Sequence, residues 1–496
     1  MNIIHVALTG LTFLLTLTGS LPAGRGATLG RILRVTGFLT PLIDVFLNSS
    51  GALGFQVFFV ALASMVAVAV TLHSEGYYKA AGIQALRKQL LFNTMLSSTL
   101  LVFNARTLGE LTVGLLLLDT LAIIATISGG SRARAAALLY AVLNMTPSII
   151  ALISAWTCIG VEGSLTTGFS ELSQVSTPQL AAVALLAGFT ARLGLAPFHA
   201  WLPIVDEEIP EHASAVLSSL VVKTGVFSLL LASSVFELSG ILYYVILVQS
   251  AATALYGGLK AALQRNIREV LAYSTLSHTG VIGVLYSLTM LHGGGLLELT
   301  LYFYVVYHGL VKAHAFMNTA LVGRLAGTLD VYKLGYLGGS CPILLAPALT
   351  VFLNLAGIPP SYGFPMKLTP LVAVVMLAPA QGPAFTAAGV VLAASSALSI
   401  LYSARFIACY TGGYRRMLKP PAVVTREELA SEYYLASATL ILPLLYIAVA
   451  SPCMPLQLAV VLIALESLTL PLYATLVLRR QGLQAWRGEC WLAGAR

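Results

Sequence analysis

The sequence contains very little charge. Only 9% of its 496 residues are Asp, Glu, Lys or Arg, whereas 58% are hydrophobic. A soluble domain usually carries about 25% charged residues, and no soluble fold of this length could hide so much apolar surface. The scarcity of charge therefore excludes a soluble protein and predicts a chain that crosses a membrane.

Cysteine is scarce as well, and its positions indicate no metal site. The five cysteines show neither paired spacing nor metal-ligand spacing, so we expect them to be ordinary apolar residues. They are Cys158, Cys341, Cys409, Cys453 and Cys490. The sequence also lacks a phosphate-binding glycine loop and a nucleophile elbow. We therefore predict that this chain binds no metal and no cofactor of its own.

The hydrophobic residues gather in long runs that are joined by short connections. A helix that crosses a bilayer needs about 20 apolar residues, and the sequence contains about fourteen or fifteen such runs. They lie near residues 3–23, 28–48, 52–72, 88–105, 109–128, 134–157, 178–202, 211–236, 241–263, 269–291, 294–323, 342–376, 382–411, 433–450 and 454–478. They predict an all-α integral membrane protein with about fourteen transmembrane helices, and 454–478 is the candidate fifteenth.

The charges between the runs differ from one side of the membrane to the other. Loops after odd-numbered runs are mostly basic, at Arg25, Arg31, Arg34, Lys79, Arg87, Lys88, Arg132, Arg134, Lys260, Arg265, Arg268, Arg324, Lys333, Arg415, Arg416 and Lys419. By the positive-inside rule, the N-terminus is outside and these loops face the cytoplasm or the mitochondrial matrix. The net charge of +8 therefore does not indicate nucleic-acid binding. The acidic run Asp206, Glu207, Glu208 and Glu211 breaks this pattern and needs its own explanation.

Two of the apolar runs are interrupted by helix breakers. The first contains Pro197 and Pro203, and the second contains Gly357-Ile358-Pro359-Pro360 followed by Pro365. Paired broken helices indicate an inverted-repeat transporter with a site near the middle of the membrane, although proline kinks are also common in membrane helices. We predict helices 1–3 over 1–84, one five-helix repeat over 85–236, a second over 237–411, and C-terminal helices over 412–496.

Two charged residues inside the runs are expected to form a pair. Asp119 lies within Leu115-Leu116-Leu117-Leu118-Asp119-Thr120-Leu121, so it cannot face lipid without a partner. Arg192 lies at the first interruption and is its expected partner. Because arginine is essentially always charged, Arg192 would act as a fixed electrostatic anchor. The alternatives are a purely structural hydrogen bond for Asp119 and a side chain that reaches the membrane surface for Arg192.

Further titratable residues lie inside later runs. Lys223 is central in its run and, as a buried lysine, is a candidate proton carrier. His308 and Lys312 share a helix face, and Lys367 follows the second interruption as the counterpart of Arg192. The simplest interpretation is a row of proton-handling groups bridged by water; ordinary core histidines and an interfacial lysine are the alternatives. Glu110 starts its run and is expected to be interfacial.

Several motifs resemble those of a known family. Ala196-Pro197-Phe198-His199-Ala200-Trp201-Leu202-Pro203 and the segment 266–280, which includes Ala272-Tyr273-Ser274-Thr275-Leu276-Ser277-His278-Thr279-Gly280, resemble two of its signatures, and His308-Gly309-Leu310 and Gly357-Ile358-Pro359-Pro360 also fit. The family is that of the antiporter-like subunits of respiratory complex I, which the multi-subunit sodium/proton antiporters share. The resemblance covers roughly residues 85–410.

The resemblance implies fourteen helices with two inverted five-helix repeats and a proton path along a central hydrophilic axis. The key acid of the family falls on Asp119, where a glutamate is usual, and its key lysine falls on Arg192. The family's lysine in span 8 falls on Lys223, and its span 12 position falls on Lys367. A lysine at that position resembles subunits 2 and 5, whereas subunit 4 normally has a glutamate there. An arginine at position 192 removes a titratable base, which gives some weight to a structural subunit that has lost pumping.

The resemblance also implies partners and a location. It favours a proton-translocating subunit of the subunit 4 type in the NADH:ubiquinone oxidoreductase; the alternatives are subunit 2 or 5 and a sodium/proton antiporter subunit. NADH, flavin, iron–sulfur clusters and ubiquinone are expected in partner subunits. Neighbouring antiporter-like subunits and membrane lipids are the expected contacts. The expected location is the mitochondrial inner membrane, or alternatively the bacterial plasma membrane.

Overall fold

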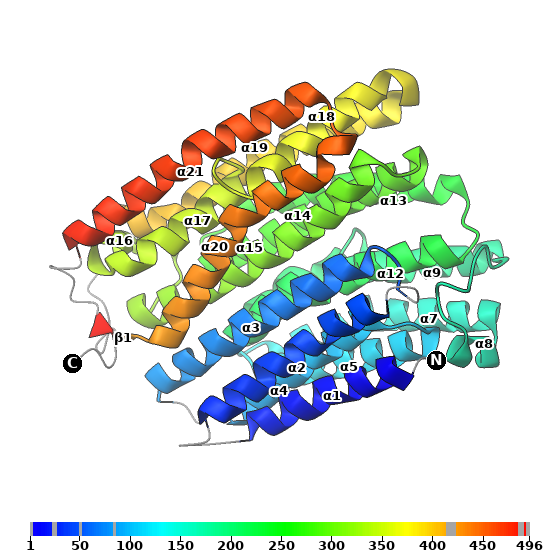
Figure 1. Ribbon diagram of the computed structural model, residues 1–496, viewed down its shortest axis with the longest axis horizontal. Coiled ribbons are helices and arrows are strands. Elements are labelled where there is room, and N and C mark those ends of the chain that lie inside the picture. Colours follow the sequence, from blue (N-terminus) through cyan, green and yellow to red (C-terminus); the bar gives the residue numbers. More distant parts are fainter. Residues whose placement is uncertain are drawn as a thin grey trace. The chain divides into compact units, whose positions relative to one another are not determined.

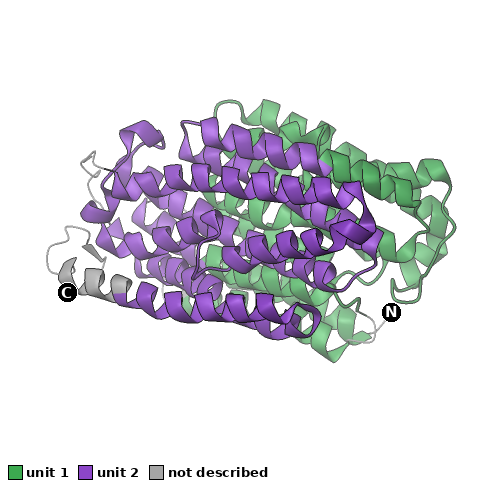
Figure 2. Ribbon diagram, turned by 90° about the horizontal axis from the view of Figure 1, so that it is seen from above, with its two compact units in different colours: residues 1–71, 84–249 green, residues 72–83, 250–496 purple. Residues whose placement is uncertain are grey.

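A computed structural model describes residues 3–21, 27–48, 52–82, 86–412, 423–484 and 491–492. The basic positions Arg25, Arg415, Arg416 and Lys419, together with Cys490, lie outside these ranges. The chain divides into two compact units, which Figure 2 colours separately: unit 1 comprises Met1–Thr71 and Gln84–Gln249, and unit 2 comprises Leu72–Ile83 and Ser250–Arg496. Two helices, α3 and α13, are each divided between the units.

Unit 1 is built from helices (Figure 1). It contains α1 (Ile3–Ser20), α2 (Ala27–Leu47), the first part of α3 (Gln56–Ala80), α4 (Leu86–Asn104), α5 (Leu108–Ile127), α6 (Ala133–Tyr140), the π-helical turn η3 (Ala141–Met145), α7 (Thr146–Ile159), α8 (Val161–Thr166), α9 (Gln179–Leu193), the 3-10 turn η4 (Phe198–Ala200), α10 (Trp201–Glu208), α11 (Glu211–Val216), the π-helical turn η5 (Leu217–Val221), α12 (Lys223–Val235) and the first part of α13 (Gly240–Leu263).

Unit 2 is also helical and has two very short strands. It contains the remainders of α3 and α13, α14 (Ile267–His292), α15 (Leu296–Ala326), η6 (Val331–Lys333), α16 (Leu337–Ser340), η7 (Pro342–Leu344), α17 (Leu345–Ala356), α18 (Gly363–Gln381), α19 (Pro383–Thr411), β1 (Val423–Val424), α20 (Arg426–Ala450), η8 (Ser451–Cys453), α21 (Leu456–Gln484) and β2 (Trp491–Leu492). Strands β1 and β2 pair in parallel, with Val423 opposite Trp491.

The predicted all-α membrane fold is confirmed. Every apolar run expected from the sequence corresponds to helix, including the run at 454–478, which forms α21. In the described part of the chain, eleven helical segments are long and apolar enough to cross a membrane. The runs at 28–48, 88–105, 269–291 and 294–323 form helices of sufficient length but are more polar. The number fourteen stays a prediction.

Each unit has a helix that is buried along nearly its whole length. In unit 1, every residue of the membrane-length window within Glu211–Val235 is buried. In unit 2, α15 is buried from Thr300 to Val322. A helix that is apolar all round belongs inside a bundle, and these two helices bring Lys223, His308 and Lys312 to the interiors of their units.

Both predicted interruptions break their helices in the same way. Helix α9 ends at Leu193, Gly194 adopts a left-handed φ of +79°, and Ala196–Pro197 is a cis peptide. Helix α17 ends at Ala356, Gly357 adopts φ +73°, and Pro359–Pro360 is a cis peptide. Only glycine enters the left-handed region without steric cost, so each glycine ends its helix.

One expectation about cysteine is wrong. Cys341 is disulfide-bonded, whereas Cys158, Cys409 and Cys453 are free thiols. Spacing along the chain could not predict this bond, because a disulfide depends on which residues meet in space rather than on sequence interval.

Candidate functional site

The centre of unit 1 contains a fully buried ion pair. Arg192 donates from Nη1 to Asp119 Oδ2 and from Nη2 to Asp119 Oδ1, both at 2.9 Å. The arginine is 0% exposed and the aspartate 1% exposed. Two parallel bonds between a guanidinium and a carboxylate form the strongest common geometry for such a pair. The predicted partnership is therefore present, and the alternative that Arg192 reaches the membrane surface is wrong.

Neighbouring side chains hold the two charges in place. The Tyr140 hydroxyl donates to Asp119 Oδ1 at 2.7 Å, and Arg192 Nε donates to Thr224 Oγ1 at 2.6 Å. Arg192 Nη1 also donates to Ser148 Oγ at 3.3 Å. A buried ion pair is stable only when its remaining donors and acceptors are satisfied. These three partners come from α6, α12 and α7, so the pair joins several helices of the unit.

The helix that carries Arg192 contributes to the electrostatics of the pair. Arg192 lies in the last turn of α9, where unpaired backbone carbonyls carry partial negative charge. The fixed cation is therefore stabilised both by Asp119 and by the end of its own helix. Close packing supports this arrangement, because a Cβ on Gly225 would lie 2.4 Å from the backbone nitrogen of Leu193.

Lys223 lies directly beside this network. It precedes Thr224, the residue that binds Arg192, and its Nζ donates to the carbonyl of Ser218 at 2.7 Å. The π-helical turn η5 covers Leu217–Val221 immediately before it, and such turns occur frequently at functional sites. The Ser218 carbonyl that accepts from Lys223 therefore belongs to this turn.

The structure explains one member of the acidic run that broke the charge pattern. Asp206 is 0% exposed and lies in α10, within the unit. Ser218 Oγ donates to its Oδ2 at 2.5 Å, and Ser214 Oγ donates to its Oδ1 at 2.8 Å. Ser218 thus contacts Asp206 with its side chain and Lys223 with its backbone. Asp206 is an internal acid of the Lys223 network and not a loop charge.

Unit 2 contains a polar seam between α14 and α15. Lys312 on α15 is 0% exposed and donates to the carbonyl of Leu271 at 3.0 Å and to Ser274 Oγ, both on α14. One turn away from Lys312, His308 stacks on His278, with ring centroids 4.8 Å apart. The two predicted residues therefore meet the same neighbouring helix at successive turns.

His278 on α14 contacts both α15 and α19. Its Nδ1 lies 2.6 Å from the hydroxyl of Tyr304, and its Nε2 lies 3.1 Å from the hydroxyl of Tyr402 on α19. An imidazole with a partner at each nitrogen can accept a proton on one side and release one on the other. His278 lies in the motif at 266–280 and is not among the predicted site residues; its place in that motif is the signal in the sequence for a functional residue.

Lys367 reaches the same region from α18. Its Nζ donates to the carbonyl of Leu355 at 2.5 Å and to Ser399 Oγ. A small cavity adjoins it, lined by Ser277, His278, Tyr304, Lys367, Ser399 and Tyr402 among others. Polar groups on several sides suit bound water, which can carry protons between side chains. The predicted Lys367 and the unpredicted His278 therefore line the same cavity.

A further buried acid in unit 2 was missed. Glu432 on α20 is 0% exposed, and its Oε2 lies 3.2 Å from His314 Nε2 and accepts from Asn318 Nδ2 at 2.8 Å. Tyr410 donates to Asn318 Oδ1 at 2.6 Å. The sequence placed Glu432 just before an apolar run, where an acid is ordinarily at the membrane surface. In the described part of the chain, no cluster of His, Cys, Asp and Glu could hold a metal ion.

Comparisons with known proteins fit this arrangement. The family described as NADH:quinone oxidoreductase/Mrp antiporter, TM, matches residues 110–395, more than half of the chain. The chain is 34% identical over 244 residues to hydrogenase-4 component B of Escherichia coli, covering 46% of this chain and 36% of that protein. It is 34% identical over 236 residues to NADH-quinone oxidoreductase subunit N of Chlorobium chlorochromatii, covering 45% and 44%.

A solved structure extends the likeness of fold to nearly the whole chain. A chain of the Mrp complex from Dietzia sp. matches with a TM-score of 0.71 at 17% identity, over 94% of this chain and 98% of that chain. In sequence, by contrast, this chain spans less than half the length of the two relatives above. The chain is a multi-pass integral membrane protein that belongs to the NADH:quinone oxidoreductase/Mrp antiporter family.

Proposed function

We propose that this protein is a proton-translocating, antiporter-like subunit of a membrane-bound respiratory complex. One observation carries the proposal: in unit 1, a fixed, fully buried ion pair lies next to a buried lysine. Asp119 and Arg192 pair through two hydrogen bonds, and Arg192 also donates to Thr224, the residue that directly follows Lys223. Charges inside a membrane are costly and are retained mainly where they move ions or protons.

The two kinds of cation have different roles in this proposal. Arg192 keeps its charge, so it anchors Asp119 and sets the local field. Lys223, Lys312 and Lys367 exist in protonated and neutral forms, so they load and release protons. A change in the Asp119–Arg192 contact alters the field at Lys223 and shifts its proton affinity. In unit 2, His278, the stacked His308 and the Tyr402 hydroxyl would carry protons between Lys312 and the cavity at Lys367.

We propose the subunit 4 type of the NADH:quinone oxidoreductase as the specific assignment. The separation of Arg192 and Lys223, 223 − 192 = 31 residues, supports it. NADH, flavin, iron–sulfur clusters and quinone would then belong to partner subunits, and neighbouring antiporter-like subunits would be its contacts. Because the two relatives compared by sequence are bacterial proteins, we place the protein in a plasma membrane rather than in the mitochondrial inner membrane.

The first test is to find the chain in its complex. Native gels of the source membranes, stained for NADH dehydrogenase activity, should contain this chain in the active band when it is analysed by mass spectrometry. The complex with Lys223→Ala should then pump fewer protons per electron. Lys79→Ala is the matched control, since Lys79 is exposed at the end of α3. Wild-type stoichiometry in the Lys223→Ala complex would overturn the proposal.

A sodium/proton antiporter subunit is the second candidate. It is supported by the fold, since the match to the Mrp complex covers 94% of this chain and 98% of the matched chain. This function predicts proton movement that depends on sodium and needs no NADH, and purification together with small antiporter subunits. Release of protons from everted vesicles on addition of sodium, measured without NADH, separates it from the respiratory function.

A further inference from the structure

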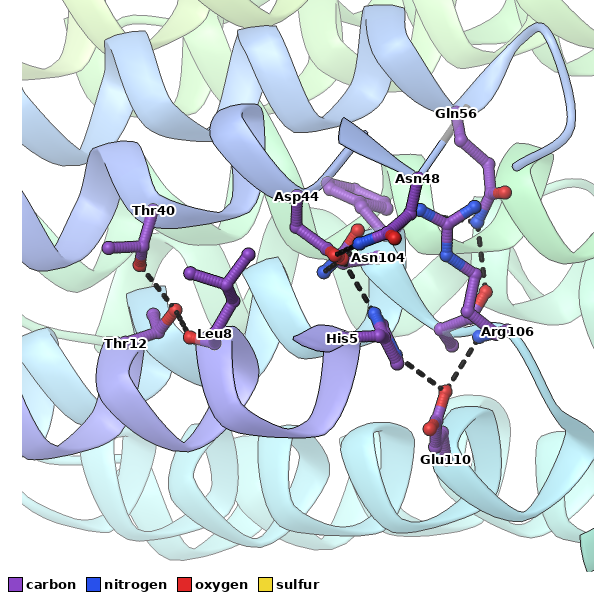
Figure 3. Close-up of polar contacts among 12 residues, drawn as sticks. His5, Leu8, Thr12, Thr40, Asp44, Asn48, Gln56, Asn104, Arg106 and Glu110 are labelled. Atoms are coloured by element: carbon purple, nitrogen blue, oxygen red, sulfur yellow. Dashed lines mark hydrogen bonds and ion pairs between the residues drawn. The ribbon is translucent and has the colours of Figure 1, made fainter. Parts of the chain in front are cut away.

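A second titratable cluster lies in unit 1, away from the Asp119–Arg192 pair. The His5 imidazole stands between two carboxylates (Figure 3): its Nδ1 lies 2.6 Å from Asp44 Oδ2, and its Nε2 lies 3.3 Å from Glu110 Oε2. His5 is 3% exposed and Asp44 is 0% exposed, whereas the Glu110 side chain is 18% exposed. One imidazole thus joins a partly exposed acid to a fully buried acid.

The cluster forms where several helices begin or end. His5 lies in the first turn of α1, Asp44 in the last turn of α2, and Glu110 in the first turn of α5. These positions are at one end of the helices, which the charge rule places on the outer side of the membrane. Glu110 is predicted to be interfacial, and the structure adds a buried partner, His5.

Asp44 is held by neutral donors as well as by His5. Asn48 Nδ2 donates to Oδ1 at 2.6 Å, and Asn104 Nδ2 donates to Oδ2 at 2.7 Å. Glu110 is positioned by the backbone, since the amide of Arg106 donates to its Oε2 at 2.7 Å. The carboxylates are therefore fixed, one on each side of the His5 ring.

The guanidinium of Arg106 gives a second, independent indication. Arg106 is 8% exposed, and its Nη2 lies 3.7 Å from Asp44 Oδ2. Within the described ranges, its Nε, Nη1 and Nη2 all lack a hydrogen-bond acceptor. Buried donors of this kind are normally satisfied by ordered water, so we expect the cluster to be hydrated. Water is the medium through which a buried acid exchanges protons.

The charges of the cluster leave room for one additional proton. The charged groups of α1, α2, α5 and the α4–α5 connection that meet here are His5, Asp44, Glu110 and Arg106. Two carboxylates and one guanidinium sum to one negative charge. A protonated imidazole brings the sum to zero, and a neutral imidazole leaves it negative. The cluster can therefore gain and lose one proton without separating a charge from its partner.

The cluster is distinct from the site around Asp119. Glu110 and Asp119 are nine residues apart on α5, which is two and a half turns, or about 13–14 Å, and places them on opposite faces. The polar side chains further along α1 have a simpler role: Thr12 contacts Thr40 at 2.7 Å and Thr16 contacts Ser97 at 2.8 Å. These hydroxyls also donate to backbone carbonyls one turn back and serve helix packing.

We propose that His5, Glu110 and Asp44 form a proton-exchange site in which the imidazole passes protons between the partly exposed Glu110 and the buried Asp44. The role of this site in net proton translocation rests on the function proposed above, whereas the protonation of His5 can be tested independently of that function. The partner at this site is the proton, delivered as hydrated acid from the outer side.

The transfer balances without any additional reactant. The neutral imidazole begins with its proton on Nδ1, facing the Asp44 carboxylate. Protonated Glu110 gives its proton to Nε2, which leaves a Glu110 carboxylate and an imidazolium. The Nδ1 proton then passes to Asp44, which becomes neutral while the imidazole keeps the proton on Nε2. One proton has moved from Glu110 to Asp44, and the reverse sequence returns it.

The test measures the protonation state of the His5 imidazole as a function of pH. The full-length protein, labelled with ¹⁵N-histidine and reconstituted in vesicles, is titrated between about pH 5 and 11 by NMR, since the two carboxylates favour the protonated ring and move its titration upward. The His5 signal is assigned by its loss in His5→Gln. We expect the ring to change from the charged imidazolium to the neutral imidazole as the pH rises through this range. Glu110→Gln or Asp44→Asn should move the midpoint of this titration by about 1 pH unit or more.

Thr12→Val is the matched control, because it removes a hydroxyl contact from the same pair of helices but leaves all four charged groups in place. It should leave the His5 titration unchanged. The proposal is overturned if the wild-type His5 ring keeps one protonation state over the whole pH range. It is also overturned if the midpoint of the His5 titration is the same in both carboxylate variants as in the wild type. The wild-type titration decides this even when a variant fails to fold.

A transport measurement separates this proposal from the proposed function. In proteoliposomes of the complete complex, His5→Ala should slow proton translocation about 10-fold or more, as expected for loss of a positioned proton carrier, and added imidazole should restore part of the rate. Translocation that is lost in Lys223→Ala but unchanged in His5→Ala supports the main site and contradicts this one. If His5 titrates as expected but the complex moves no protons, the proton-exchange site is supported and the proposed function in proton translocation is contradicted.

Discussion

The two broken helices both end at a left-handed glycine that is followed by a cis peptide bond to proline, but they hold different cations. In unit 1, the cation is Arg192, two residues before Gly194, and it is bound by a carboxylate. In unit 2, the residue two positions before Gly357 is Leu355, and its carbonyl accepts from Lys367, which arrives from the helix after the break. A cation therefore lies at the C-terminal end of the first half-helix in both units, where the helix dipole favours it.

The difference teaches what each break can do. Arg192 faces an ionised partner and cannot release its proton under ordinary conditions, so the first break holds a permanent charge. Lys367 donates to two neutral oxygens, the Leu355 carbonyl and the Ser399 hydroxyl, and borders a cavity that is also lined by His278 and Tyr402. The second break therefore holds a charge that can be present or absent. An alignment of the two breaks does not superimpose the two cations, because Arg192 precedes its glycine in the sequence and Lys367 follows its glycine.

The largest effect is expected from removing the permanent charge. Arg192→Ala leaves the Asp119 carboxylate buried without a cation, which should destabilise the protein by about 3–5 kcal/mol. Thermal unfolding in detergent measures this. Arg192→Lys, which keeps a cation, should recover most of the loss. A stable Arg192→Ala protein would show that the pair does not hold α5 against α9.

The second break should respond in function more than in stability. Lys367→Ala removes two hydrogen bonds to neutral oxygens, so the free energy of unfolding should fall by only about 1–3 kcal/mol, while proton translocation is lost. Lys367→Arg is the informative companion, since it keeps the charge but does not release a proton. It should fold normally and still fail to pump, and normal pumping by this variant would make Lys367 a structural cation only.

The glycine at the second break tests whether its shape positions Lys367. Gly357→Ala places a Cβ 2.5 Å from Lys367 Cδ at a left-handed φ of +73°, whereas Gly293→Ala introduces the same kind of backbone strain at a left-handed φ of +93° in open space. Each should cost about 1–3 kcal/mol from the backbone alone. We expect Gly357→Ala to lower the free energy of unfolding more than Gly293→Ala does and, unlike Gly293→Ala, to reduce proton translocation.

The smallest expected effects sharpen the contrast between the units. Tyr140→Phe removes one of the donors to Asp119, which keeps both bonds from Arg192, so it should lower stability by about 1 kcal/mol and leave translocation intact. Tyr402→Phe removes the hydroxyl at His278 Nε2 and should slow translocation with a similarly small stability change. Proton flux and thermal unfolding of both variants show whether the units differ as proposed.

Several features of the molecule could be predicted from residues close together in the sequence. The runs that form helices are recognisable because burial in lipid requires long apolar stretches. Both breaks follow from glycine and proline, whose backbone limits act locally. The partnership of Asp119 and Arg192 also followed, because a charge deep in an apolar run must find a partner and few opposite charges were available.

The contacts that complete the sites could not be predicted in this way. Asp206 seemed to be a loop charge, yet Ser218 joins it to Lys223, and neither His5 nor Asp44 was singled out. Such contacts depend on which faces of distant helices meet. A helix such as α5 is apolar around nearly its whole circumference, so its pattern does not reveal the buried face.

The sequence by itself therefore determined the membrane class, the helices, the two breaks and the charged residues that cannot face lipid. Those properties follow from hydropathy and from local backbone chemistry. Only the tertiary structure decided that Arg192 is a fully paired, permanent charge, that Lys367 reaches back to the Leu355 carbonyl, and that His5 joins Glu110 to Asp44. Each of these contacts links separate helices, and their relative rotation and depth are set by packing, which no single segment encodes.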